Sequence, residues 1–196
     1  ETVPMTSVQL LLLNLLYDAL CLVLPWDQVD EDTYLQPLEW SGRTLGRFMR
    51  FFGPISSIFD IVTFVFLFFV FCPSVCGGSF ASLAAGGGQE RFIALFQTGW
   101  FLESMWTQIL ILHLLRTRKI PLFQSKPSRS VMLVTTLGIL IFTVMTFTPV
   151  GHLIGLTSLP PAYFGFLIAV VLLYLLLVTF AKYWYVKKYH LSLIHI

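Results

Sequence analysis

Long apolar runs alternate with short polar or glycine-rich stretches along the whole chain. A helix needs about 20 mainly apolar residues to cross a bilayer, and it pairs its own backbone groups in lipid, where a lone strand leaves them unpaired. The pattern therefore predicts an all-α membrane protein built as a bundle of five transmembrane helices. We expect these helices at residues 5–24, 48–71, 92–115, 131–150 and 161–186.

The composition supports the membrane assignment. Of the 196 residues, 57% are hydrophobic and 11% are charged. Soluble globular domains carry roughly 25% charged residues, so this chain has too little charge to cover a water-facing surface. We also find no nucleophile–base pair and no phosphate-binding motif, so the sequence predicts no catalytic residue.

The connections between the apolar runs differ in charge. Loop 25–47 is acidic and ends with arginines, loop 116–130 is basic, and 72–91 is rich in glycine, serine and alanine. With the five predicted helices, 11 of the 12 Lys and Arg residues fall on one side, and only Arg91 falls opposite. The positive-inside rule then predicts that loops 25–47 and 116–130 and the C-terminus are cytoplasmic. An odd helix count that begins outside leads us to expect a larger protein upstream.

Two polar residues interrupt the first apolar run. Asn14 and Asp18 are four residues apart, so they share one face of a helix. A charge at mid-bilayer costs at least about 2.5–3.5 kcal/mol, whereas a hard cation bound to side-chain oxygens would neutralise it. This face is a candidate ion site. The structural alternative is that Asp18 pairs with a basic residue or is protonated while Asn14 bonds to a neighbouring helix.

The second and third apolar runs each carry a carboxylate. Glu103 lies close to Thr107 and Gln108, and these polar residues fit either a second half-site for the cation or a structural hydrogen-bond network. We expect Asp60 to pair with Arg47 or Arg50. Two cysteines at the extracytoplasmic end fit either a disulfide or two free thiols, namely Cys72 and Cys76.

Several of these stretches resemble one family. They are Asn14-Leu-Leu-Tyr-Asp18, residues 45–60, Gly99-Trp-Phe-Leu-Glu-Ser and His113-Leu-Leu-Arg-Thr-Arg-Lys-Ile-Pro. Over about residues 4–190 the chain resembles the C-terminal membrane portion of P-type cation-transporting ATPases, which contains their sixth to tenth helices. Within that superfamily the resemblance is greatest to bacterial magnesium-transporting ATPases.

The resemblance implies a site and a mechanism. Asn14 and Asp18 match the ion-site pair of the sixth helix, Gln108 matches an ion-site position on the eighth helix, and Glu103 lies a turn and a half earlier. The transported ion would be Mg²⁺, with ATP used only through domains outside this chain. The loop 25–47 would contact the phosphorylation domain.

The resemblance also implies the surroundings of the chain. Residues 1–190 would form a transmembrane domain in the bacterial inner membrane. Its partners would be lipid and the remaining helices and cytoplasmic domains of the same pump, and we expect no nucleic acid. Residues 191–196 look like a non-native tail. The alternatives are the same region of a calcium or other cation pump, a stand-alone channel or ion-coupled transporter, and a purely structural membrane subunit.

Overall fold

The computed structural model describes residues 3–27, 42–115 and 128–189, and every regular element within these ranges is helical. The long helices are α1 (Ser7–Val23), α3 (Gly42–Phe66), α5 (Gln89–Leu115), α6 (Arg129–Met145) and α8 (Pro161–Tyr189). Short segments connect or extend them: η1 (Leu24–Trp26), η2 (Leu67–Phe71), α4 (Cys72–Cys76), η3 (Ser82–Gly86) and α7 (Pro149–Leu153).

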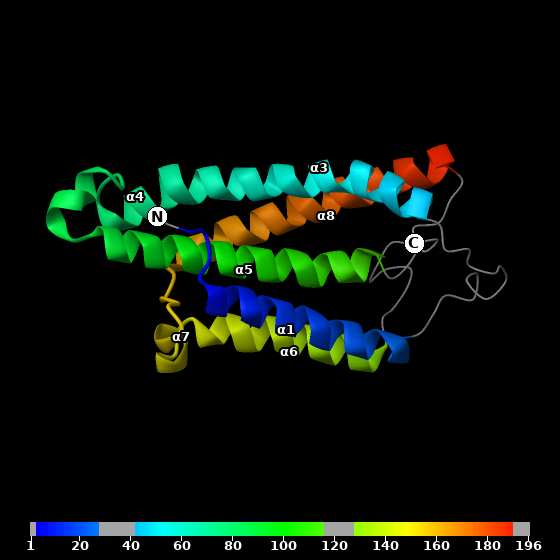
Figure 1. The fold of residues 1–196 in the computed structure, drawn as a ribbon, viewed down its shortest axis with the longest axis horizontal. Coiled ribbons are helices and arrows are strands. Elements are labelled where there is room, and N and C mark those ends of the chain that lie inside the picture. Colours follow the sequence, from blue (N-terminus) through cyan, green and yellow to red (C-terminus); the bar gives the residue numbers. More distant parts are fainter. Residues whose placement is uncertain (1–2, 28–41, 116–127, 190–196) are drawn as a thin grey trace.

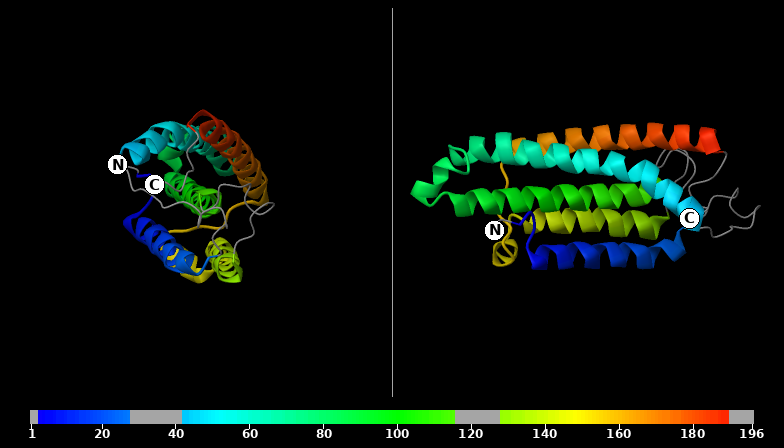
Figure 2. Two further views of the ribbon diagram at one scale, coloured as in Figure 1. Left: turned by 90° about the vertical axis from the view of Figure 1, so that its right-hand side faces the viewer. Right: turned by 45° about the horizontal axis from the view of Figure 1, so that its top comes forward.

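The long helices lie side by side in an elongated bundle (Figure 1). Helices α1 and α6 form one pair, α3 and α8 form another, and α5 runs between the two pairs, as the end-on view in Figure 2 also shows. Helices α1 and α5 both start at the end of the bundle where α4 and α7 lie, so they run in the same direction. Helices α3 and α6 run the opposite way.

Within the described residues the structure is all-helical and fits a membrane helical bundle. Three of the helical stretches are long and apolar enough to cross a bilayer, namely Ser7–Trp26, Met49–Cys76 and Pro161–Trp184. Helix α6 is apolar but shorter, and α5 is interrupted by polar residues such as Gln97 and Glu103. The span predicted at 92–115 is helical throughout, whereas the one predicted at 131–150 is helical only as far as Met145, because residues 146–148 turn the chain before α7 begins at Pro149. The count of five transmembrane spans stays a prediction.

The second long helix extends further than the apolar pattern predicts. Helix α3 continues into η2, a π-helical segment, and then into α4. Pro73 has no N–H, so it cannot bond to the carbonyl of Phe69. The Cys72 N–H bonds to the carbonyl of Leu67, five residues back, which is the π-helical pattern. Gly77, with φ of 79°, then ends the helix in a left-handed conformation that suits glycine.

Helix α5 forms the centre of the packing. Gly99 allows η2 and α8 to approach α5 closely, because a Cβ at this position would lie 2.8 Å from Leu67 and 3.4 Å from Tyr163. The buried Tyr163 hydroxyl donates a 2.6 Å hydrogen bond to the Gly99 carbonyl. A second cluster between α3 and α8 contains Phe59 and Tyr174, whose rings pack edge to face at 5.1 Å. These contacts fix the positions of α3, α5 and α8 relative to one another along the bundle axis.

Candidate cation-binding site

Helix α1 has one buried face and one exposed face. Gln9, Leu13 and Leu20 are buried and recur at near-helical spacing. Asn14 and Asp18 are both exposed in the described part of the chain. The shared face that the sequence predicts for these two residues is therefore present, and it lies away from the helices that pack on α1.

Three contacts along its length hold α1 against residues 128–155, the α6–α7 segment, which contains both helices and their flanking residues. In the middle, a Cβ on Gly138 of α6 would lie 3.1 Å from Leu16 and 3.7 Å from Ile109, so the absence of a side chain at Gly138 lets the helices meet. At one end, the Gln9 side chain donates to the Gly155 carbonyl at 3.5 Å. Just beyond the other end, the Oδ1 of Asp27 accepts a hydrogen bond from the Ser128 backbone N–H.

The Gly138 contact also sets the relative depth of α1 and α5. The side-chain ends of Leu16 and Ile109 both lie within 4 Å of the position that a Cβ on Gly138 would take, and their helices run in parallel, so the two residues lie at a similar level. Asn14 and Asp18 lie two residues to either side of Leu16, and the half-buried Gln108 immediately precedes Ile109. The structure therefore places these three oxygen-bearing side chains at a similar depth in the bundle.

Glu103 lies elsewhere on α5. It precedes Gln108 by five residues, which corresponds to about 7 Å along the axis and about 140° around it. Its side chain is 0% exposed and interacts electrostatically with Asp60 of α3 and with Tyr163 and Tyr174 of α8. Glu103 thus faces α3 and α8, while Asn14 and Asp18 are on the exposed face of α1.

The polar residues Glu103, Thr107 and Gln108 of α5 do not form a side-chain hydrogen-bond network around Glu103 among the described residues. The Thr107 hydroxyl donates to the backbone carbonyl of Glu103 at 2.9 Å, which is a common local bond in helices. Neither carboxylate oxygen of Glu103 has a hydrogen-bond partner among the described residues. The Thr63 hydroxyl of α3 is also buried without a partner in this part of the chain.

The expected pairing of Asp60 with an arginine is not seen for Arg50. The Arg50 guanidinium donates to the Gly46 carbonyl at 3.2 Å and is exposed. Helix α3 is continuous through Pro54, so ten residues separate Arg50 from Asp60, or about 15 Å along the axis. The Arg47 side chain lies outside the described residues. The cysteine alternatives are also resolved here, since Cys72 and Cys76 are both free thiols.

The described residues supply only part of a metal site. Within them, no group of three or more His, Cys, Asp and Glu side chains lies close enough to hold a metal ion. Asn14 and Asp18 together offer three side-chain oxygens on this face, and the amide oxygen of Gln108 belongs to α5, not to this face. Because Mg²⁺ and Ca²⁺ take six or more oxygen ligands, a cation on this face needs water or groups from elsewhere.

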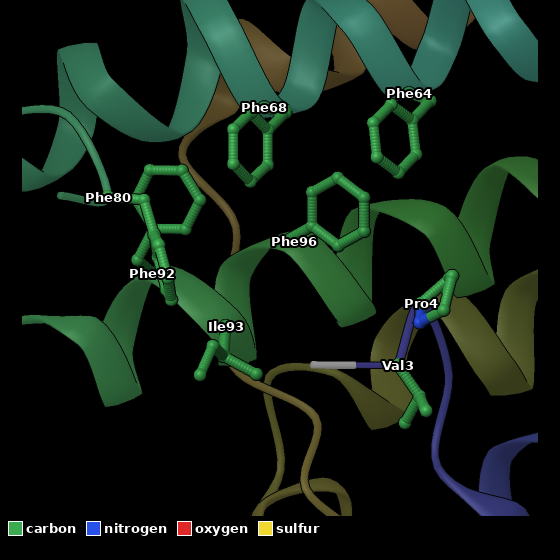
Figure 3. Close-up of a pocket in the computed structure, with 8 residues that line it drawn as sticks. All are labelled: Val3, Pro4, Phe64, Phe68, Phe80, Phe92, Ile93 and Phe96. Atoms are coloured by element: carbon green, nitrogen blue, oxygen red, sulfur yellow. The ribbon is translucent and has the colours of Figure 1, made fainter. Parts of the chain in front are cut away.

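A cavity of about 50 Å³ lies near the end of the bundle where α1 and α5 start (Figure 3). Its lining consists of apolar side chains: Phe64, Phe68, Phe80, Phe92, Phe96, Ile93, Val3 and Pro4. It offers no side-chain oxygen, so its chemistry is wrong for a hard cation.

One polar contact near the candidate site was not expected from the sequence. Asp27 counts only as one acid of loop 25–47 in the sequence, yet its Oδ1 accepts a 2.7 Å hydrogen bond from the Ser128 backbone. Its partner is 101 residues away, so no local pattern indicates it. Residues 28–41 and 116–127 of the two predicted cytoplasmic loops, and the tail 191–196, lie outside the described residues.

Comparison with known proteins gives the family. The family described as cation transporting ATPase, C-terminus, matches residues 2–184. The chain is similar to a magnesium-transporting ATPase, P-type 1, of Salmonella typhimurium, with 40% identity over 186 residues, and to the protein of the same name in Escherichia coli K12, with 37% identity. Each alignment covers 95% of this chain and 19% of the relative, so the chain spans about a fifth of the relatives' length. The chain belongs to the family of cation-transporting ATPase C-terminal regions.

Proposed function

We propose that this chain is the membrane-embedded C-terminal part of an ATP-driven P-type magnesium transporter and that Asn14 and Asp18 line its cation path. The observation that carries the proposal is the exposed Asn14–Asp18 face of α1, at a similar depth to Gln108. The names of the curated relatives support magnesium as the transported ion. The cation is the cargo of the pump.

The chemistry of the face suits a hard, partly hydrated cation. Mg²⁺ gives up its water reluctantly and binds through one or two carboxylates while it keeps several waters. Asp18 supplies the charge and the amide of Asn14 supplies a neutral oxygen, while Gln108 would offer a neutral oxygen at another position along the path, on α5 at a similar depth. Glu103 is a candidate for a separate position along the path, because it lies on a different face of α5 about 7 Å away.

In the proposed pump, ATP acts through domains that are not part of this chain. An aspartyl phosphate forms there, and the helices then alternate the side from which the cation reaches Asn14 and Asp18. The loop 25–47 is the proposed contact with the phosphorylation domain. The partners of this chain are the other helices of the pump and membrane lipid, which suits the many exposed leucines of α1 and α8.

The proposal is tested with Asp18→Asn in the full-length pump. Asparagine keeps the shape of the side chain and removes the charge, so we expect Mg²⁺ uptake to be lost while the protein still reaches the membrane in normal amount. Uptake is measured in cells and in proteoliposomes. Glu90→Gln is the matched control, because Glu90 is an exposed carboxylate in the first turn of α5.

Two results would contradict the proposal. Wild-type uptake by Asp18→Asn would show that this face does not carry the cation. Uptake of Ca²⁺ in place of Mg²⁺ by the unaltered pump would retain the pump assignment and overturn the choice of magnesium.

A further inference from the structure

The contact between Asp27 and Ser128 joins two helices at the end of the bundle where α1 stops and α6 starts (Figure 1). Asp27 follows η1, which continues α1, and Ser128 is the N-cap residue of α6. The carboxylate oxygen accepts from the Ser128 N–H at 2.7 Å, while the Ser128 hydroxyl accepts from the Val131 N–H at 3.3 Å. A negative charge at a helix N-terminus also interacts favourably with the helix dipole.

This bond completes the attachment of α1 to the α6–α7 segment. The other two contacts are Leu16 against Gly138 and the Gln9 side chain on the Gly155 carbonyl. Helix α1 is therefore held at both ends and in the middle by one continuous stretch of chain. All three contacts leave the exposed face with Asn14 and Asp18 uncovered.

Asp27 is also placed between two parts of the proposed mechanism. It lies nine residues after Asp18, directly after the 3-10 turn η1 that continues α1, or about 14 Å away along the axis. It also lies at the start of the loop 25–47.

We propose that Asp27 is a positioning residue, which fastens the end of α1 to the N-terminus of α6 so that the two helices move as a unit and hold Asn14 and Asp18 at the correct position for the cation. The inference rests on the proposed pump function. Hydrogen bonds to a charged group are about twice as strong as neutral ones, so this bond restrains the helix end more strongly than a neutral bond would.

The test compares three variants of the full-length pump. Asp27→Ala removes the acceptor, and Asp27→Asn retains an acceptor oxygen without the charge. Ser128→Ala is the matched control, because it removes the cap on Val131 but leaves the backbone N–H that Asp27 binds. The readouts are the Mg²⁺ concentration for half-maximal uptake, the maximal rate, and hydrogen exchange at the start of α6.

We expect Asp27→Ala to raise the half-maximal Mg²⁺ concentration by about tenfold, as the loss of a charge-assisted hydrogen bond implies. Asp27→Asn, which retains an acceptor oxygen without the charge, raises it by only about threefold. Exchange at the Ser128 amide becomes faster in Asp27→Ala and stays slow in Ser128→Ala. If Asp27→Ala does not fold, Asp27→Asn carries the test with a rise of about threefold.

Two results would overturn the inference. One is a folded Asp27→Ala pump, or a folded Asp27→Asn pump where only that variant folds, with the wild-type half-maximal concentration. The other is an equal rise in Asp27→Ala and Ser128→Ala, which would reduce the role of Asp27 to helix stability. A failure of the proposed function looks different, since the unaltered pump would then show no Mg²⁺ uptake while exchange at Ser128 still reports the contact.

Discussion

Glu103 and Thr63 are polar side chains buried between helices, whereas Asn14 and Asp18 are exposed on α1. Leu67, the first residue of η2, packs on Gly99 of α5, and α3 and α5 are antiparallel. Thr63, four residues before Leu67, and Glu103, four residues after Gly99, therefore come to a similar level. Both side chains are buried, and the oxygens of both lack partners within the described chain. A buried polar group without a partner costs about 1–3 kcal/mol, and a charged one costs more. Glu103 is therefore a source of instability unless it has a function.

Replacing Glu103 with an apolar side chain of similar length tests this. We expect Glu103→Met to raise the free energy of unfolding by roughly 1–3 kcal/mol, because it removes two unpartnered oxygens from the interior. The measurement is thermal or denaturant unfolding of the purified full-length pump. Thr107→Val is the control, since the Thr107 hydroxyl already has a backbone partner and its loss brings no gain.

The contrary result for Glu103→Met is also informative. A loss of stability together with weaker protection by Mg²⁺ would mean that Glu103 binds the cation, as the half-site hypothesis expects. Stability gained with transport intact would leave Asn14 and Asp18 as the basis of the cation path.

Close helix contacts at glycines decide how the elements pack. In a membrane, helices gain little from burying apolar surface, so small residues that allow close approach have a large influence. Gly99 meets both Leu67 and Tyr163, whereas a Cβ on Gly165 of α8 would meet nothing within 4 Å. Both glycines are inside helices, so the same substitution has two different consequences.

We expect Gly99→Ala and Gly165→Ala to change stability in opposite directions. The new methyl at position 99 would lie 2.8 Å from the fully buried Leu67, and such overpacking costs about 1–3 kcal/mol. At position 165 there is space, and alanine in a helix is more favourable than glycine by about 0.5–1 kcal/mol. Unfolding midpoints of the two variants give the comparison. A Gly99→Ala pump as stable as Gly165→Ala would show that α3 and α8 do not approach α5 as described.

The two ends of the whole bundle differ in charge. The exposed cations Arg50, Arg129 and Lys187 lie at one end, and the exposed Arg91 lies at the other. This distribution within the described residues supports the proposed orientation, with the ends of α1 and α5 at Asp27 and Leu115 on the cytoplasmic side.

Single cysteines test this orientation. In a background in which Cys21, Cys72 and Cys76 are replaced by alanine, we expect Ser82→Cys to react with a membrane-impermeant thiol reagent on intact cells. We expect Ser130→Cys to react only after the cells are opened, because it is exposed at the opposite end of the bundle. Labelling of Ser130→Cys on intact cells would reverse the proposed orientation.

The sequence by itself determined the features that depend on local periodicity. Apolar runs of sufficient length imply helices in lipid, and a spacing of four residues puts Asn14 and Asp18 on one face wherever the helix lies. The resemblance to the family also needed only short stretches of sequence, and the family match confirms it.

Only the tertiary structure decided which helices contact one another, because packing joins residues far apart in the chain. It turned Glu103 toward α3 and α8 and gave Arg50 a backbone partner on its own helix. It also joined Asp27 to Ser128 across 101 residues. The five-residue spacing already puts Glu103 and Gln108 on different faces of α5, but only the neighbouring helices show that the face with Glu103 is buried against α3 and α8.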